Sequence, residues 1–584
     1  MKRISIILLG GLLMAAGCKK GFLDINKDPN NPSTATLSQM LTANEQGLAY
    51  AMGFSNQGRG AVGFTEVLSV YMHQVTVRES QDQYNAQGDQ FDINNAWTQF
   101  YSAQSNGFGY SGFLENTNVM IRQAEAEDNL IFAGVGRILK AYGLSQMVDI
   151  FADVPYTEAN QFYLTKNGYP KFDKGQDIYP ELLKMLDTAL NNLSATATNS
   201  LVPDLDDLFY GGDVKKWTRL AKSIKLKLLV QQRLIKDVSA DVNTLFNGDL
   251  ISKLDESFMM PYGPSNSPDD RNPGFNDYYA TQRSHYVSPW FYSILKGYNP
   301  RLFTGIEDPR IPYYFYNQIK TTDTTAAGIG NTDYRDSAFV SILFGSVGPN
   351  RDRSNDNSIT VFGIYPVGGR YDDNYKNYDK TAQTNIRGVS SSSATGAAPL
   401  RLLTYADILF LKAECMNVGL IPDDGGATLK KAIEESFKQV DYVAGKANKG
   451  QNIPKLEGSA AVTNYINQIM GAYSAANTAK KLEIIMTQKW IQSYGFSCDQ
   501  YTDYRRTGYP ILFDPNDPSQ APSGRYQPPL LGDPTLGGKD QPSVRVVLGR
   551  RYPLSLPWPA DELNVNRNAP AQKQPDSYPV FWDK

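Results

Sequence analysis

The stretch VKKWTRLAKSIKLKLLVQQRLIK, residues Val214–Lys236, shows the longest helical periodicity in the chain. Its apolar side chains recur at helical spacing along two faces, whereas a helix at a protein surface needs only one. A helix with two apolar faces lies between neighbouring helices, so this stretch predicts a helical scaffold. The first face contains Trp217, Leu220, Ala221, Ile224 and Leu228, and the second contains Leu226, Leu229, Val230 and Leu234.

Similar periodicity on both sides of this stretch extends the predicted scaffold over residues 36–250 and 400–500. The helical segments follow one another without strand–helix–strand alternation, which favours a mainly α architecture of helix hairpins. Trp97, Trp217 and Trp490 each lie on a helical stripe and are expected in the core. The other predicted helices are Leu130–Asp149, whose small residues would allow close packing, and Ile178–Leu193, Leu402–Val418, Ala427–Val443 and Lys480–Phe496.

Large irregular insertions separate the helical blocks. Residues 255–400 contain long stretches rich in Gly, Pro, Asn, Ser and Tyr, and stretches of this length without regular structure are usually functional or disordered. A few short strand pairs are expected there, around Phe339–Phe344 and Thr360–Pro366. The Pro-rich tail, residues 509–584, is expected to wrap around the domain rather than extend its helices.

The composition excludes several classes of function. The chain has 36 Tyr, 26 Phe and 6 Trp but only 2 His, so neither a zinc site nor a histidine-based triad is expected, and no cofactor or metal is predicted. A formal net charge of −3 argues against nucleic acid as a partner. Cys415 lies in an apolar helical stretch, which favours a buried thiol over a disulfide.

The N-terminus has the pattern of a bacterial lipoprotein signal. A basic start, Met1-Lys2-Arg3, precedes the apolar run Ile4–Ala16, which is too short to span a bilayer and ends in small residues before Cys18. We therefore expect residues 1–17 to be a signal peptide and Cys18 to be acylated, which would anchor the mature protein to a membrane. An ordinary secretory signal, cleaved after Ala16 or Gly17, is the alternative.

A series of motifs occurs in order along the chain. These segments are Phe22–Pro32, Asp153–Tyr156, Trp217–Leu226, Asp308–Arg310, Arg401–Glu414, Gln488–Trp490, Arg505–Pro510 and Arg551–Pro553, followed by Glu562 and Asn564. The ordered series resembles the SusD/RagB family of outer-membrane nutrient-binding lipoproteins. Lys222 departs from the family pattern, which usually has Asn there, and Lys19-Lys20 replace the acidic residues of the usual surface-export signal.

This resemblance implies a single domain over residues 18–584, with a tetratricopeptide-like helical scaffold and a ligand surface formed by the insertions. It also implies a non-enzymatic protein, lipid-anchored in the outer membrane and facing the cell surface, although Lys19-Lys20 leave the leaflet open. The implied partner is a SusC-like TonB-dependent channel, to which the protein would deliver a captured glycan. A peptide is the alternative ligand, because some family members bind peptides.

Aromatic side chains in polar loops are the candidate ligand-binding residues. A sugar has apolar C–H faces ringed by hydroxyls, so its site needs flat rings for the face and polar groups for the rim. Three loop-rich segments combine such residues. The candidates are Tyr84 in the first, Tyr286, Trp290 and Tyr292 in the second, and Tyr371, Tyr375 and Tyr378 in the third.

Three rival interpretations carry less weight. The segment Gly58–Gly63 fits a dinucleotide-binding fingerprint, but no strand precedes it. A glycoside hydrolase would need two carboxylates about 5–10 Å apart, and clusters such as Asp204–Asp207 are expected by chance among 60 acidic residues. A purely structural envelope protein would leave an open aromatic loop surface unexplained.

The anchor can be tested by substituting Cys18→Ser. Because acylation requires the thiol, the variant should remain unprocessed or reach the wrong compartment, as measured by membrane fractionation and intact mass. If the variant still fractionates with outer membranes and keeps a lipid mass, the lipoprotein interpretation is wrong.

Overall fold

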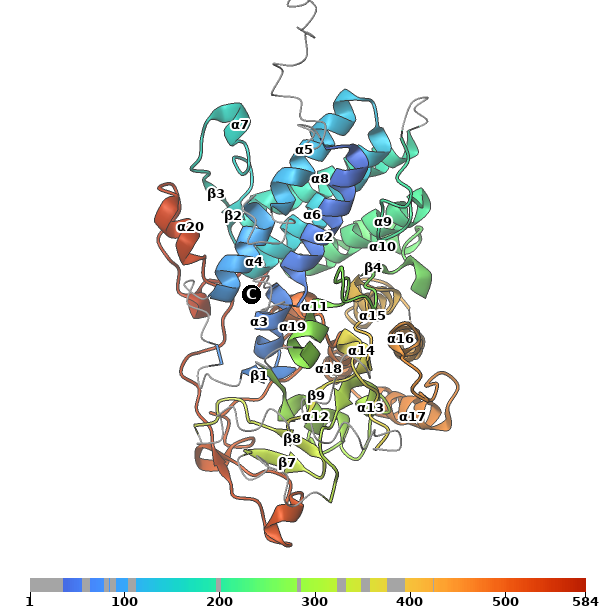
Figure 1. Ribbon diagram of the computed structural model, residues 1–584, viewed down its shortest axis with the longest axis vertical. Helices are drawn as coiled ribbons and strands as arrows, with labels where there is room; N and C mark the ends of the chain where they lie inside the picture. The colour runs from blue at the N-terminus through green and yellow to red at the C-terminus, as the bar shows by residue number, and fades with distance from the viewer. Residues whose placement is uncertain are drawn as a thin grey trace, which may run out of the picture.

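The computed structural model describes most of the chain and is mainly helical (Figure 1). It confirms the predicted fold class of helix hairpins with short strands between them. Cys18 and the segment Gly58–Gly63, except its last residue, lie outside the described residues. The described residues are 35–54, 63–77, 83–84, 91–102, 112–195, 201–280, 285–322, 332–347, 358–374, 394–423 and 425–584.

The helices form two blocks, one from each predicted scaffold region. The first block contains α2 (Leu37–Met52), α3 (Phe64–Tyr71), α4 (Phe91–Tyr101), α5 (Phe113–Ala126), α6 (Leu130–Phe151), α7 (Phe162–Thr165), α8 (Gly175–Ser194), α9 (Val214–Gln231) and α10 (Ser239–Phe246). The second contains α15 (Tyr405–Asn417), α16 (Gly425–Ala447), α17 (Ala460–Ser474), α18 (Thr478–Gln492) and α19 (Cys498–Thr507), and α20 (Ala560–Val565) follows in the tail. Between the blocks lie the short helices α11 (Pro273–Phe275), α12 (Pro289–Leu295), α13 (Ile311–Tyr314) and α14 (Ile364–Val367).

Helix α6 packs between α5 and α8, and its glycines make this packing close. A Cβ atom at Gly136 would lie 2.8 Å from Met120 of α5, and one at Gly134 would lie 3.1 Å from the Ala189 carbonyl of α8. Both distances are shorter than ordinary van der Waals contact, so larger residues would force the helices apart. The prediction that small residues allow close packing here is confirmed.

Helix α9 is buried along both of its apolar faces, as predicted. Trp217, Leu228 and Val230 have no exposed surface, and the Asp213 carboxylate caps the first turn by accepting from the Lys215 and Lys216 amides. The helix ends at Gln231 rather than at Lys236, because the chain turns there and leaves Leu234 at the surface. Trp97 and Trp490 are buried as expected, and so is the thiol of Cys415.

Helix α15 begins at Tyr405, three residues later than Leu402, because the preceding residues form a strand. Strand β10 (Leu400–Leu403) pairs with β4 (Phe258–Met260), which joins the second helical block to the inserted loops. The Thr404 hydroxyl then accepts from the Asp407 amide while the Asp407 carboxylate accepts from the Thr404 amide. This capping box sets the start of the helix.

Each sheet within the described residues has two strands. The expected strands around Phe339–Phe344 and Thr360–Pro366 are present as β8 and β9. The antiparallel pairs, besides β4 with β10, are β1 (Val75–Val77) with β5 (His285–Val287), β2 (Val154–Pro155) with β3 (Phe172–Asp173), β6 (Phe315–Tyr316) with β9 (Val361–Phe362), β7 (Tyr334–Asp336) with β8 (Phe339–Ser341), and β11 (Arg525–Tyr526) with β12 (Val544–Arg545).

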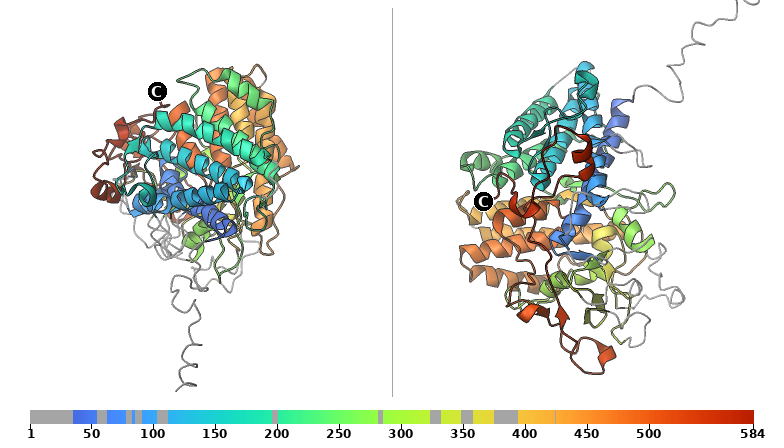
Figure 2. Two further views of the ribbon diagram at one scale, coloured as in Figure 1. Left: turned by 90° about the horizontal axis from the view of Figure 1, so that it is seen from above. Right: turned by 90° about the vertical axis from the view of Figure 1, so that its left-hand side faces the viewer.

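The tail runs along one side of the molecule, from the loop-rich end to the first helical block (Figure 2). Its contacts there are hydrogen bonds to the end of α6. The Leu556 amide donates to the Ile150 carbonyl at 2.8 Å, and the Trp582 indole donates to the Asp149 carboxylate at 2.9 Å.

In the described part of the chain, no helix combines the length and apolar character needed to cross a bilayer.

A buried network of charges joins the second helical block to the end of α9. The Glu414 carboxylate accepts from Arg506 Nη2 at 2.8 Å and from Arg233 Nε at 3.0 Å. Asp503 bridges Arg506 at 2.8 Å and Lys489 at 2.6 Å. Three of these residues, Glu414, Lys489 and Arg506, belong to motifs that identified the family resemblance, so those motifs mark charges buried inside the scaffold.

Removing one charge from this network should destabilise the fold strongly. We expect Glu414→Gln to lower the free energy of unfolding by about 3–5 kcal/mol, because Arg233 and Arg506 would keep their charges in the core with less compensation. Glu434→Gln is the matched control, since Glu434 lies at the surface, 3.8 Å from Lys430. Its cost should stay below about 1 kcal/mol in the same urea titration. Equal losses in the two variants would contradict the proposed role.

The stabilisation from Glu414 should also depend on pH. Burial alone would raise the pKa of Glu414, but Arg506 and Arg233 hold it below its ordinary value. A carboxyl with a lowered folded-state pKa contributes stability above its unfolded pKa, about 4.3, and this contribution is lost as pH falls further. The advantage of the wild type over Glu414→Gln should therefore be constant between pH 7 and 5 and shrink by pH 3. An advantage that is unchanged at pH 3 would count against this assignment.

Candidate functional site

A cavity of about 840 Å³ lies at the loop-rich end of the molecule, where Figure 1 shows β7, β8 and the tail. Its walls come from α12 and the loop after it, from β7, from α18, and from the tail between Ile511 and Leu530. Four rings line it, together with acidic, amide and guanidinium groups. The rings are Trp290, Tyr298, Tyr334 and Tyr526, and the polar residues include Asn299, Arg301, Asp336, Glu483, Asp517, Ser519, Gln520 and Gln527.

Helix α12 and the turn after it position two of the rings. Trp290 follows Pro289 in the first turn of the helix, and its indole donates to the Ile511 carbonyl at 3.1 Å. Gly297 then turns the chain with a φ of +71°, and a Cβ atom there would lie 2.6 Å from the Ile306 amide. This turn presents Tyr298 at the cavity wall with 48% of its surface exposed.

The Asp336 carboxylate fixes the orientation of Tyr298. Its Oδ2 accepts from the Tyr298 hydroxyl at 3.0 Å and from the Tyr292 hydroxyl at 2.7 Å. Burial and the charge of Asp336 raise the pKa of both tyrosines, so both stay protonated at neutral pH. Burial likewise raises the pKa of Tyr526 to about 12. The lining therefore combines neutral rings with acidic side chains.

The Glu483 carboxylate forms the deepest polar part of the lining. Only 3% of its side chain is exposed, and its Oε2 lies 2.9 Å from Lys480 Nζ. Its Oε1 is buried, accepts no hydrogen bond, and lies 3.5 Å from Arg301 Nε. The charge of Glu483 is therefore compensated by Arg301 and Lys480.

Among the aromatic candidates of the second segment, Trp290 alone lines the cavity. Tyr292 lies behind the wall, stacked on Phe339 with ring centroids 3.7 Å apart, and reaches the site only through its bond to Asp336. Tyr286 belongs to β5 and has no exposed surface. Burial of Tyr286 and Tyr292 follows from their place in the packing of β5 and α12 against the core.

The other candidates lie elsewhere. Tyr84 is 3% exposed, shares a 2.7 Å hydrogen bond with His73, and borders a second cavity of about 420 Å³. Burial lowers the pKa of His73 to about 3, so this pair is neutral. Tyr371 is half-buried against the edge of Tyr313 and does not line the larger cavity. Tyr375 and Tyr378 lie outside the described residues.

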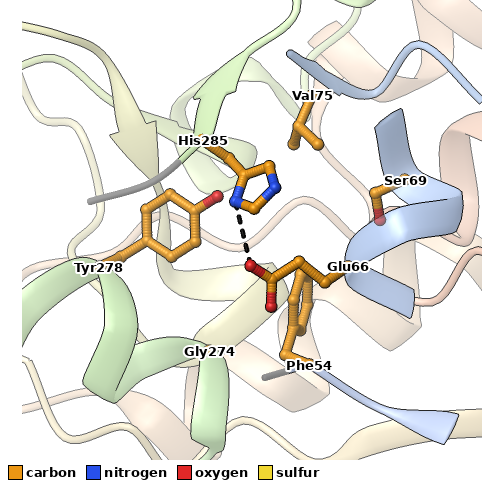
Figure 3. Close-up of a pocket in the computed structure, with 7 residues that line it drawn as sticks. All are labelled: Phe54, Glu66, Ser69, Val75, Gly274, Tyr278 and His285. Carbon is orange, nitrogen blue, oxygen red and sulfur yellow. Dashed lines mark ion pairs between the residues drawn. The ribbon is translucent and has the colours of Figure 1, made fainter. Parts of the chain in front are cut away.

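A small polar pocket around His285 is a packing feature. His285 Nδ1 lies 3.2 Å from the Glu66 carboxylate, between Tyr278 and Ser69 (Figure 3). The pocket is too tight to admit a water molecule, and the side chains of His285 and Glu66 are both buried. Among the described residues, no group of three or more His, Cys, Asp or Glu side chains is arranged to hold a metal ion.

Most of the residues that line the larger cavity are not among the candidates predicted from the sequence. Tyr298 and Tyr526 are aromatic residues beside turn-forming Asn-Pro and Gln-Pro pairs, which is a signal for exposed rings. No pattern in the sequence, however, indicates that residues 228 positions apart meet in one cavity, and Glu483 lies on a helix that was assigned to the core.

Comparisons with known proteins agree with this architecture. A SusD homologue from Bacteroides fragilis is 16% identical, with a TM-score of 0.61 over 94% of this chain and 99% of its own. A SusD/RagB family protein from Bacteroides thetaiotaomicron is 19% identical, with a TM-score of 0.62 over 94% and 99%. A chitin-binding protein is 20% identical, with a TM-score of 0.60 over 91% and 95%. At these identities the likeness shows the fold alone.

The family itself is shown by a sequence model. No curated protein matches the chain. The model of the SusD-like family, described as starch-binding and associating with the outer membrane, matches residues 29–529. This match covers most of the sequence and agrees with the order of motifs from Asp153 to Arg506. The chain therefore belongs to the SusD-like family.

Proposed function

We propose that this protein captures glycans at the outer membrane and binds them in the cavity of about 840 Å³ at its loop-rich end. The observation that carries the proposal is the combination of one exposed ring, Tyr298, and the partly exposed rings of Trp290 and Tyr526 with hydrogen-bonding groups in one cavity. Members of the family are non-catalytic binding proteins, so the predicted absence of an enzymatic activity stands. The glycan would then pass to a SusC-like TonB-dependent channel, with Cys18 as the lipid anchor.

The lining suits a sugar chain for a simple chemical reason. Trp290, Tyr298 and Tyr526 offer flat faces for the apolar C–H surfaces of the rings, while carboxylate and amide oxygens can accept from hydroxyls. The volume falls within the roughly 300–1,000 Å³ usual for ligand sites. The chitin-binding relative and the starch-binding description of the family support a glycan as the ligand class.

A hydrolytic role for the cavity has less support, although acidic residues line it. Hydrogen bonds from Ser519 hold the pKa of Asp517 below its ordinary value, which is the opposite of what a general acid requires. Asp336 already accepts from two tyrosine hydroxyls. The lining is therefore better suited to accepting hydrogen bonds than to donating a proton.

Removing the rings should weaken glycan binding. We expect Trp290→Ala and Tyr298→Ala each to weaken binding by about threefold to tenfold, because one aromatic contact contributes about 0.5–1.5 kcal/mol. A panel of soluble starch, chitin oligosaccharides and plant polysaccharides identifies the glycans that the wild type binds, and calorimetry then measures each variant.

Tyr442→Ala is the matched control for these variants. Tyr442 is a tyrosine of α16 with 40% of its surface exposed, so its removal should leave both folding and binding unchanged. Circular dichroism should confirm that all three variants fold. If folded Trp290→Ala and Tyr298→Ala both bind glycan as tightly as the wild type, the cavity is not the glycan site.

The partner can be tested in the native membrane. We expect the protein to co-purify in mild detergent with a large β-barrel channel, because family membership implies a TonB-dependent partner. Affinity purification of the full-length lipoprotein followed by mass spectrometry measures this. Recovery as a monomer alone, under conditions that keep other envelope complexes intact, would contradict the proposed partnership.

A further inference from the structure

The charge of the cavity narrows the class of glycan that it can accept. Asp336, Glu483 and Asp517 contribute three carboxylates, while Arg301 is the sole basic residue among the described residues that line the cavity. We infer that the cavity selects glycans without acidic groups, because an acidic sugar would meet mostly like charge in the lining. This inference rests on the proposed function of the cavity.

Glu483 contributes its charge to the lining rather than a direct contact. Its Oε1 is buried and lies 3.5 Å from Arg301 Nε, so this oxygen is not open to a ligand. A ligand carboxylate in the cavity would be repelled by the carboxylates of Asp336 and Asp517, because two like charges close together repel each other.

Several donors in the lining are already engaged with acceptors of the protein. The Trp290 indole donates to the Ile511 carbonyl at 3.1 Å, and the Tyr298 hydroxyl donates to Asp336 at 3.0 Å. The Gln527 amide nitrogen donates to the Gln541 carbonyl at 2.8 Å. These donors are therefore not available to a ligand carboxylate.

Arg301 does not offset this acidic lining. Its Nε lies 3.5 Å from Glu483 Oε1, and its side chain is 59% exposed, so it is directed partly to solvent. A carboxylate ligand would have to compete with Glu483 for this one guanidinium. Lys480 is likewise engaged, with its Nζ 2.9 Å from Glu483 Oε2.

The test compares acidic polysaccharides with their carboxyl-reduced forms, which keep the same backbone and linkages. Polygalacturonate, glucuronan, mannuronan and hyaluronan are each measured beside the reduced polymer and beside neutral starch and chitin oligosaccharides. We expect binding to be confined to the neutral and reduced members, with any acidic parent at least tenfold weaker than its reduced form.

The possible outcomes separate the two proposals. An acidic polymer that binds more tightly than its reduced form, with this binding lost in Trp290→Ala, would overturn the inference and leave the proposed function standing. Absence of binding to every polymer of the panel, neutral or acidic, would overturn the proposed function itself and the inference with it.

Two variants assign the selectivity to these carboxylates. Glu483→Gln should reduce the affinity ratio of each reduced polymer to its acidic parent, since the substitution removes one negative charge from the lining. Asp517 lies at the solvent-exposed rim, so Asp517→Asn should fold normally. This variant should reduce the affinity ratio of each reduced polymer to its acidic parent at least twofold. If this affinity ratio is unchanged in folded Asp517→Asn and in folded Glu483→Gln, the selectivity does not come from these carboxylates.

Discussion

The buried pairing of Glu414 with Arg506 and Arg233 is the interaction on which the architecture depends. It connects α15, α19 and the end of α9, which lie far apart in the sequence. Charges removed from water must be matched closely by their partners, because an unmatched one costs several kcal/mol. Helix packing alone would tolerate several arrangements of the same apolar faces, but the network leaves each charge compensated in only one of them.

The network also positions the cavity. Arg506 lies near the end of α19, and the chain reaches Ile511 only five residues later. Ile511 accepts from the Trp290 indole, and the segment that follows it forms one wall of the cavity. One wall of the site is therefore an irregular segment that begins close to the buried ion pairs of Arg506.

The scaffold could be predicted well from the sequence. Helical periodicity is a local pattern, and the family motifs occur in a recognisable order along the chain. The two apolar faces of Val214–Lys236 required a buried helix, and the motifs at Arg401–Glu414 and Arg505–Pro510 marked charges that proved to be buried partners. The cavity could not be predicted in the same way, because Trp290, Glu483 and Tyr526 meet only in the folded chain. Aromatic richness was ambiguous too, since Tyr286 and Trp290 occur in one segment but only the second reaches a cavity.

The hydrogen bond between Tyr298 and Asp336 affects the entropy that is lost when a ligand binds. A tyrosine that is 48% exposed would normally sample several rotamers and lose that freedom when a ligand orders it. Here Asp336, itself held by the core residue Tyr292, orders the ring during folding. The entropy of that side chain is thus lost before any ligand arrives, so the ordering cost of capture falls mainly on the flexible ligand rather than on the protein.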